Sequence, residues 1–207
     1  MKRIISLLLS FLMLISLVSC FMSPLGFGNK KTVITRGTID DEVYVNDCMG
    51  IEFVRPATWV YSTDEEIAAV IGIGVEMLGD KKFQAALDEN YALYDMMVID
   101  KITNTNIIVG YENLKMSFST NITEEQYIES VKKQFDDAEN MTVTFPYRTE
   151  KVKLGNTRFT RIVCDTVTNG VRMTQVFYAH KMNGYMGIVV VTMRGDYTVE
   201  DIEAMFR

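Results

Sequence analysis

Residues 157–193 read TRFTRIVCDTVTNGVRMTQVFYAHKMNGYMGIVVVTM, and this stretch decides the fold. Two Asn-Gly pairs, at 169–170 and 183–184, separate runs rich in apolar and β-branched residues. Asn-Gly is a strong signal for a two-residue hairpin turn, because both residue types tolerate positive φ. The stretch therefore predicts a three-stranded antiparallel meander.

Taking both turns as two-residue loops sets the register of this meander. Thr168 then faces Val171, and Met182 faces Tyr185. Stepping inward gives an apolar row on each face of the sheet: Ile162, Phe177 and Val190 on one, and Val163, Val176 and Val191 on the other. A sheet that is apolar on both faces must be covered on both, so we expect helices or loops on either side.

Shorter elements surround the meander. Two alternating runs separated by Asn, Asp and Gly predict a hairpin over 43–54, followed by an extended stretch at 58–61. The pattern that follows predicts a helix from about residue 62 to 78, a helix over 81–90, and strands over 94–100 and 106–112. It then predicts a helix from about residue 123, strand-like residues 141–153, and a helix over 198–206. Every strand connection that can be assigned locally is a hairpin. The predicted class is α+β, an antiparallel sheet with helices packed on both faces.

The N-terminus has the pattern of an export signal. Lys2 and Arg3 precede an uncharged apolar run over 4–18. This run has about 15 residues, whereas a membrane-spanning helix needs about 20. The run ends in Leu17-Val18-Ser19-Cys20, which resembles the bacterial lipobox.

The lipobox resemblance implies a covalent lipid. Cleavage would fall between Ser19 and Cys20, and the thiol of Cys20 would carry a diacylglyceryl group. An ordinary secretory signal that contains a cysteine and a plain N-terminal membrane anchor are the alternatives. Lipidation places the protein at the cell membrane, facing the extracytoplasmic side.

This interpretation divides the chain into three parts: a signal peptide over 1–19, a lipidated N-terminus and flexible tether over 20–42, and a single domain over 43–207. Removing the signal takes away two basic residues and no acidic one, which leaves 19 basic and 27 acidic side chains and a net charge of −8. Such a body is repelled by an anionic bilayer, so the lipid must hold it there. Two acyl chains give stable anchoring.

Composition excludes several classes of protein. Of the 207 residues, 48% are hydrophobic and 23% charged, which is ordinary globular usage and excludes a disordered tail, a collagen-like fibre and a polytopic membrane protein. Three cysteines are too few for a disulfide-dense scaffold. The net charge of −6 gives no general attraction to nucleic acid.

The order of elements resembles the PsbP-like fold, which occurs in small exported lipoproteins of Firmicutes. The resemblance rests on YVNDCMGIEFVRPATW (44–59), DEEIAAVIG (64–72), YDMMVID (94–100), IIVGYENL (107–114), the meander, and TVEDIEAMF (198–206). It implies an α/β/α sandwich over about 165 residues. None of these motifs is catalytic, so the resemblance carries no ligand site onto this chain.

Candidate catalytic residues are sparse. His180 is the single histidine, which excludes a multi-histidine metal site. In the predicted register it lies across from Gly187 and Phe159, far from Asp165, so no triad can be drawn locally. We expect a structural imidazole, and no enzyme activity.

Other candidates also favour structural roles. Cys48 and Cys164 could pair in an oxidising exterior, although unpaired thiols are favoured. The cluster Asp40, Asp41, Glu42 and Asp47 lacks the spacing of a calcium loop and predicts a solvated acidic edge. Gly72-x-Gly74 lies inside a helical pattern and is not a nucleotide fingerprint. We expect no metal and no cofactor.

The expected function is a non-catalytic lipoprotein module that binds an envelope protein or peptide. Trp59 and Tyr61, beside the first helix, form the candidate binding surface. The alternative is a small-ligand-binding or transporter-accessory lipoprotein. About 165 residues cannot build the two lobes of a classical solute-binding protein.

Overall fold

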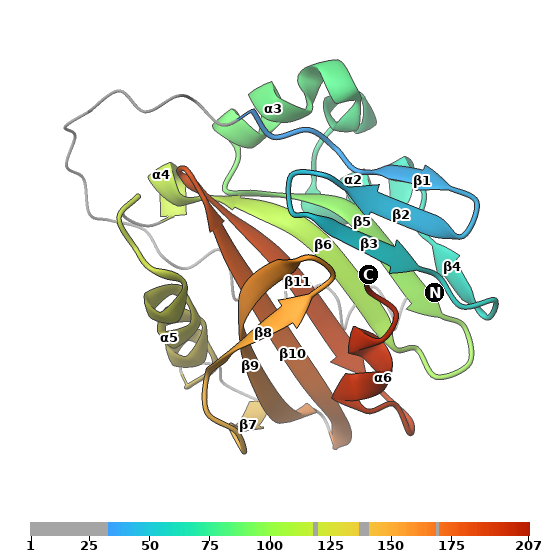
Figure 1. Cartoon of the computed structure of the whole chain (residues 1–207), viewed down its shortest axis with the longest axis vertical. Coiled ribbons are helices and arrows are strands. Elements are labelled where there is room, and N and C mark those ends of the chain that lie inside the picture. The colour runs from blue at the N-terminus through green and yellow to red at the C-terminus, as the bar shows by residue number, and fades with distance from the viewer. Residues whose placement is uncertain (1–32, 118–119, 137–140, 169) are drawn as a thin grey trace.

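The computed structural model describes residues 33–117, 120–136, 141–168 and 170–207, and within them the strands form two antiparallel sheets (Figure 1). The small sheet has the order β1 (Thr38–Asp40), β2 (Val43–Asn46), β3 (Ile51–Val54). The large sheet contains β4 (Trp59–Tyr61), β5 (Ala92–Asp100), β6 (Asn106–Asn113), β7 (Met141–Thr144), β8 (Glu150–Leu154), β9 (Thr157–Thr168), β10 (Val171–Met182) and β11 (Tyr185–Met193). Its order is β4-β5-β6-β11-β10-β9-β7, and β8 also pairs with β9.

The central meander has the predicted register. Phe177 pairs with Ile162 on one side and with Val190 on the other, and Val176 joins Val163 and Val191 in the same way. The turn at 183–184 has positive φ at both residues, 28° and 94°, as a two-residue hairpin of this type requires. Asn169, in the other predicted turn, lies outside the described residues.

The predicted single sheet would include the hairpin over 43–54, but in the structure this hairpin does not join the large sheet. Its strands are four residues long, and alternate side chains such as Tyr44 and Phe53 point inward and are fully buried. The outer edge of β3 is occupied by the C-terminus, since Val54 N–H donates to Met205 O at 2.9 Å. Burial of one face and pairing with the chain end thus place the hairpin in a separate layer.

The helices are α2 (Asp64–Ile71), η1 (Val75–Leu78), α3 (Asp80–Glu89), α4 (Leu114–Ser117), α5 (Glu124–Asp136) and α6 (Val199–Glu203). Thr63 and Glu66 form a capping box at the start of α2. The predicted helix over 62–78 is split, because Gly72 ends α2 in the left-handed conformation with φ of 83°.

Helices lie on both faces of the large sheet. Phe177 packs edge-on against Phe135 of α5 with ring centroids 5.5 Å apart, whereas the next residue, Tyr178, donates to Glu203 of α6 at 3.0 Å. Successive strand residues point to opposite faces, so α5 and α6 cover opposite sides. The small sheet shares the α6 side (Figure 1). The chain is therefore of the α+β class with antiparallel sheets, as predicted.

The predicted signal, Ser19 and Cys20 lie outside the described residues. Residues 33–42, which the sequence assigned to the tether, run along the folded body: Ile34 is 1% exposed and β1 pairs with β2, although β1 itself is exposed. Among the described helices, none combines the length and apolar character needed to span a bilayer.

Candidate functional site

Asp95 lies at the centre of a buried polar network between the two sheets. It sits on β5 where a bulge shifts the pairing with β6, and a bulge re-aims the side chain that it carries. Its Oδ2 accepts hydrogen bonds from the Tyr44 hydroxyl at 2.5 Å, from Asn46 Nδ2 at 2.8 Å and from Gly37 N–H at 2.8 Å. These donors belong to β2 or to the segment entering β1, so the carboxylate ties the small sheet to the large one.

Arg36 supplies the cation of this network. Its Nη1 and Nη2 donate to the two carboxylate oxygens of Asp64 at 2.8 and 2.9 Å, and its Nε donates to Asp95 Oδ1 at 3.3 Å. The same guanidinium reaches the carbonyls of Leu78 at 2.9 Å and Asp95 at 3.1 Å. Asp64 begins α2 and Leu78 ends η1, so Arg36 joins the N-terminal segment, the helices and β5.

Burial sets the electrostatics of the network. Desolvation raises the pKa of Asp95, and the hydrogen bonds from Tyr44 and Gly37 and the charge of Arg36 oppose that rise. Desolvation also raises the pKa of Tyr44. The Arg36 hydrogen bonds lower the pKa of Asp64. Asp95 and Tyr44 are both enclosed, and the hydrogen bond between them joins the two layers.

Glu112 is a second buried carboxyl, on the face that α5 covers. Its Oε1 accepts a hydrogen bond from the Tyr127 hydroxyl of α5 at 2.8 Å. Burial raises the pKa of Glu112 to about 7, against the opposing effect of the Tyr127 bond. The Tyr94 pKa is raised by burial and by the nearby Glu112 carboxyl. The contact of α5 with β6 therefore contains a group that titrates near neutral pH.

His180 occupies the predicted position. It pairs with Gly187, and its ring lies 5.4 Å from that of Phe159. Its Nδ1 is 3.1 Å from the Arg158 carbonyl and 3.5 Å from Glu124 Oε1. These contacts anchor the start of α5 to the meander.

The hydrogen bonds around Glu124 hold the start of α5 against the large sheet. Burial favours the neutral acid, but hydrogen bonds from His180, the Lys181 N–H and the Thr160 hydroxyl lower the Glu124 pKa overall. The Thr160 hydroxyl donates to Glu124 at 3.0 Å, so it is not activated by the imidazole. Nucleophile, base and orienting acid do not come together here.

The two cysteines within the described residues, Cys48 and Cys164, are both free thiols. Burial raises the pKa of Cys164 to about 12, which keeps that thiol protonated and unreactive. The Sγ of Cys48 lies 3.3 Å from the hydroxyl of Thr35. Of the two sequence alternatives, the structure shows the unpaired thiols.

The acidic residues Asp40, Asp41, Glu42 and Asp47 are exposed, as expected for a solvated edge. Within the part of the chain that the structure describes, no group of three or more His, Cys, Asp or Glu side chains is arranged to hold a metal ion.

The predicted binding surface is wrong for Trp59. This side chain is 0% exposed, donates from Nε1 to the Tyr197 hydroxyl at 3.1 Å, and packs edge-on against the Tyr197 ring at 5.7 Å. Tyr61 is half-buried, donates to the Glu42 carbonyl at 3.2 Å, and lies beneath the Arg55 guanidinium. Burial raises the pKa of Tyr61 to about 12. Trp59 is buried because β4 is the edge strand of the large sheet and the C-terminal segment packs over it.

The substitution Trp59→Phe tests this placement. We expect it to lower the free energy of unfolding by about 2 kcal/mol, because it removes a buried ring and leaves the Tyr197 hydroxyl without its donor. Urea denaturation followed by circular dichroism measures the change. An unchanged stability would mean that Trp59 is a surface residue after all.

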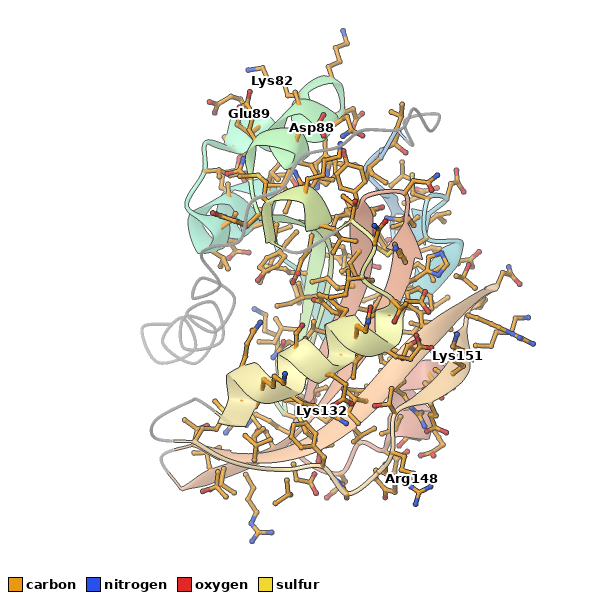
Figure 2. The ribbon with its side chains drawn as sticks, turned by 90° about the vertical axis from the view of Figure 1, so that its left-hand side faces the viewer. Lys82, Asp88, Glu89, Lys132, Arg148 and Lys151 are labelled. Atoms are coloured by element: carbon orange, nitrogen blue, oxygen red, sulfur yellow. The ribbon has the colours of Figure 1, made fainter. Side chains whose placement is uncertain are left out.

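A surface hollow of about 500 Å³ runs along the outer side of α5. Its described lining consists of Ile122, Glu125, Gln126, Glu129, Ser130 and Lys133. Figure 2 shows α5 lying across the view, with Lys132 on it and Lys151 on neighbouring β8. The described lining comes from α5 and the short segment before it, and the hollow is open to the outside of the molecule.

Sequence reasoning missed Asp95, Glu112 and Arg36. Two of them carried a readable signal, since Asp95 and Glu112 each interrupt a strand pattern of apolar residues. A charge within such a strand needs a buried partner. The partners Arg36 and Tyr127 are 59 and 15 residues away from their carboxylates, so local pattern cannot identify them.

No protein-family model matches this chain, and no curated protein matches it.

Proposed function

We propose that this chain is an extracytoplasmic lipoprotein, held at the cell membrane by a diacylglyceryl group on Cys20. One observation carries the proposal: a basic start and a 15-residue apolar run end in Leu17-Val18-Ser19-Cys20. The order and spacing of these three features are those of a lipoprotein signal.

The path of the described N-terminal segment supports an anchoring role. Ile34 is buried and its N–H donates to Gln84 of α3 at 2.6 Å. Arg36 follows with its bonds to Asp64 and Asp95. A force applied at residue 33 would therefore act on the contacts with α2, α3 and β5, and would not detach a single strand.

We further propose that the domain is a PsbP-like, non-catalytic module that binds a protein or another component of the envelope. The support is the resemblance of its motifs to that fold and the antiparallel α+β architecture. Two buried carboxyl groups and one partly buried carboxyl group also serve internal contacts: Asp95 joins the sheets, Glu112 meets α5, and Glu124 anchors the start of α5.

The second candidate is a small-ligand-binding or transporter-accessory lipoprotein. The observation that favours it is the surface hollow of about 500 Å³ beside α5. Capture from native membranes discriminates the two. A stoichiometric protein recovered with the acylated chain, and also with a soluble form lacking residues 1–20, supports the binding module. A small molecule retained by both forms supports the alternative.

The anchor itself is tested by Cys20→Ser. We expect the variant to lose lipidation and the signal cleavage that follows it, because serine has no thiol to accept the lipid, and therefore to keep residues 1–19. Intact mass measurement reports both properties. Cys48→Ser is the matched control and should behave as the parent chain. Unchanged mass and processing in Cys20→Ser would refute the anchor.

A further inference from the structure

One end of the domain gathers the first described residues, α3, α4 and the β10–β11 turn, and is called here the α3 end. Gln84 of α3 accepts from Ile34 N–H and donates from Nε2 to the Tyr185 hydroxyl at 3.0 Å. Lys115 of α4 lies over the Tyr185 ring at 5.8 Å, and Leu114 N–H donates to Gly184 O at 3.0 Å. The chain thus enters the packed body at a surface built from three distant segments.

Large apolar side chains are exposed at the α3 end. Val33 is 61% exposed, Tyr91 50% and Met116 40%. Tyr91 follows α3, and its carbonyl accepts from Asn113 N–H at 2.8 Å, which places it beside the start of α4. These three exposed apolar side chains lie at the end of the domain where the chain enters the packed body.

Exposed lysines accompany these side chains. Lys81 and Lys82 lie on the first turn of α3, and Lys115 lies on α4. Figure 2 shows Lys82 pointing outward from this end. Lysines can lay their methylenes on apolar surface while the ammonium groups meet lipid phosphates. A tyrosine among them suits the boundary between acyl chains and water.

We propose that the α3 end lies against the lipid surface of the membrane that holds the anchor, with Val33, Tyr91 and Met116 at the contact. This inference rests on the proposed lipidation of Cys20. Residues 20–33 span at most about 45 Å when fully extended, so the lipid keeps this end within reach of the bilayer. An intramolecular contact needs little affinity of its own, because the tether sets a high effective concentration.

The opposite end then points away from the membrane. Figure 2 shows Glu89 of α3 towards one end of the molecule and Arg148 towards the other. Tyr147, next to Arg148, is 63% exposed. Tyr91 and Tyr147 are thus two exposed tyrosines near opposite ends, and they form a matched pair for measuring orientation.

The experiment uses the full acylated chain in vesicles of phosphatidylethanolamine and phosphatidylglycerol whose acyl chains are brominated. The variants are Tyr91→Trp and Tyr147→Trp, and the parent chain supplies the baseline because its tryptophan, Trp59, is 0% exposed. We expect bromine to quench about half of the emission added by Tyr91→Trp, since an interfacial indole lies next to the acyl chains. The emission added by Tyr147→Trp should not be quenched.

A third variant checks that the contact is apolar. Val33→Asp with Met116→Asp, placed in the Tyr91→Trp chain, should abolish the added quenching while the protein still floats with the vesicles. Flotation separates the two proposals, because a chain that does not float refutes the anchor. A chain that floats without quenching at position 91, or with stronger quenching at 147, refutes the orientation alone.

Discussion

Replacing Asp95 with alanine is expected to lower the free energy of unfolding by about 3–5 kcal/mol, because each buried donor that loses its acceptor costs about 1–3 kcal/mol. Arg36 loses one of its two carboxylate partners and keeps its bonds to Asp64. In this chain the loss would also leave the Tyr44 hydroxyl, Asn46 Nδ2 and Gly37 N–H without their acceptor. Urea denaturation of the parent and the variant measures the difference.

Two further variants sharpen this test. Asp196→Ala removes an exposed carboxylate and should change the stability by less than about 0.5 kcal/mol. Asp95→Asn keeps the volume but adds amide donors where the site already supplies donors, so its stability should fall between those of the parent and Asp95→Ala. If Asp95→Ala were as stable as the parent, the two sheets would not be joined through this carboxylate.

The second large effect is a pH dependence that Glu112 carries. Its pKa is raised from 4.5 to about 7, so the folded chain retains a proton that the unfolded chain has released between those pH values. Stability is therefore fully present below the unfolded pKa and is lost as the pH rises through the folded one. A shift of this size corresponds to about 3 kcal/mol. Glu112→Gln cannot ionise and still offers a carbonyl oxygen to Tyr127.

Unfolding curves for the parent and Glu112→Gln between pH 4 and pH 8 isolate this group, since the other carboxylates titrate alike in both. The variant should gain about 3 kcal/mol relative to the parent by pH 8. Glu89→Gln, at an exposed position of α3, is the control and should follow the parent at every pH. A constant difference between the parent and Glu112→Gln would show that the carboxyl does not titrate beneath α5.

The elements with strong local signals were predictable. Two Asn-Gly turns and continuous apolar alternation are sufficient for the register of β9, β10 and β11. The apolar face of α5 was also predicted from the spacing of its apolar residues. All four of these residues are buried: Tyr127, Ile128, Val131 and Phe135. In both cases the determinants lie within a few residues of one another.

The small sheet and the buried network could not be derived in this way. The sequence pattern of residues 43–54 is the same whether the two strands extend the large sheet or form a separate layer on it. Which arrangement forms depends on contacts with Phe206 and Met205 at the other end of the chain. Trp59 was assigned to the surface because a short strand after Pro56 gives no sign of what covers it. Arg36 lay in a segment without an apolar period, although it holds three other segments together.

The lipid at Cys20 is the central claim, and mass spectrometry of the N-terminal peptide from the native membrane fraction tests it most directly. We expect a peptide that begins at Cys20 and carries the added mass of a diacylglyceryl thioether. A peptide that begins at Met1, or one cleaved elsewhere with an unmodified Cys20, would contradict it.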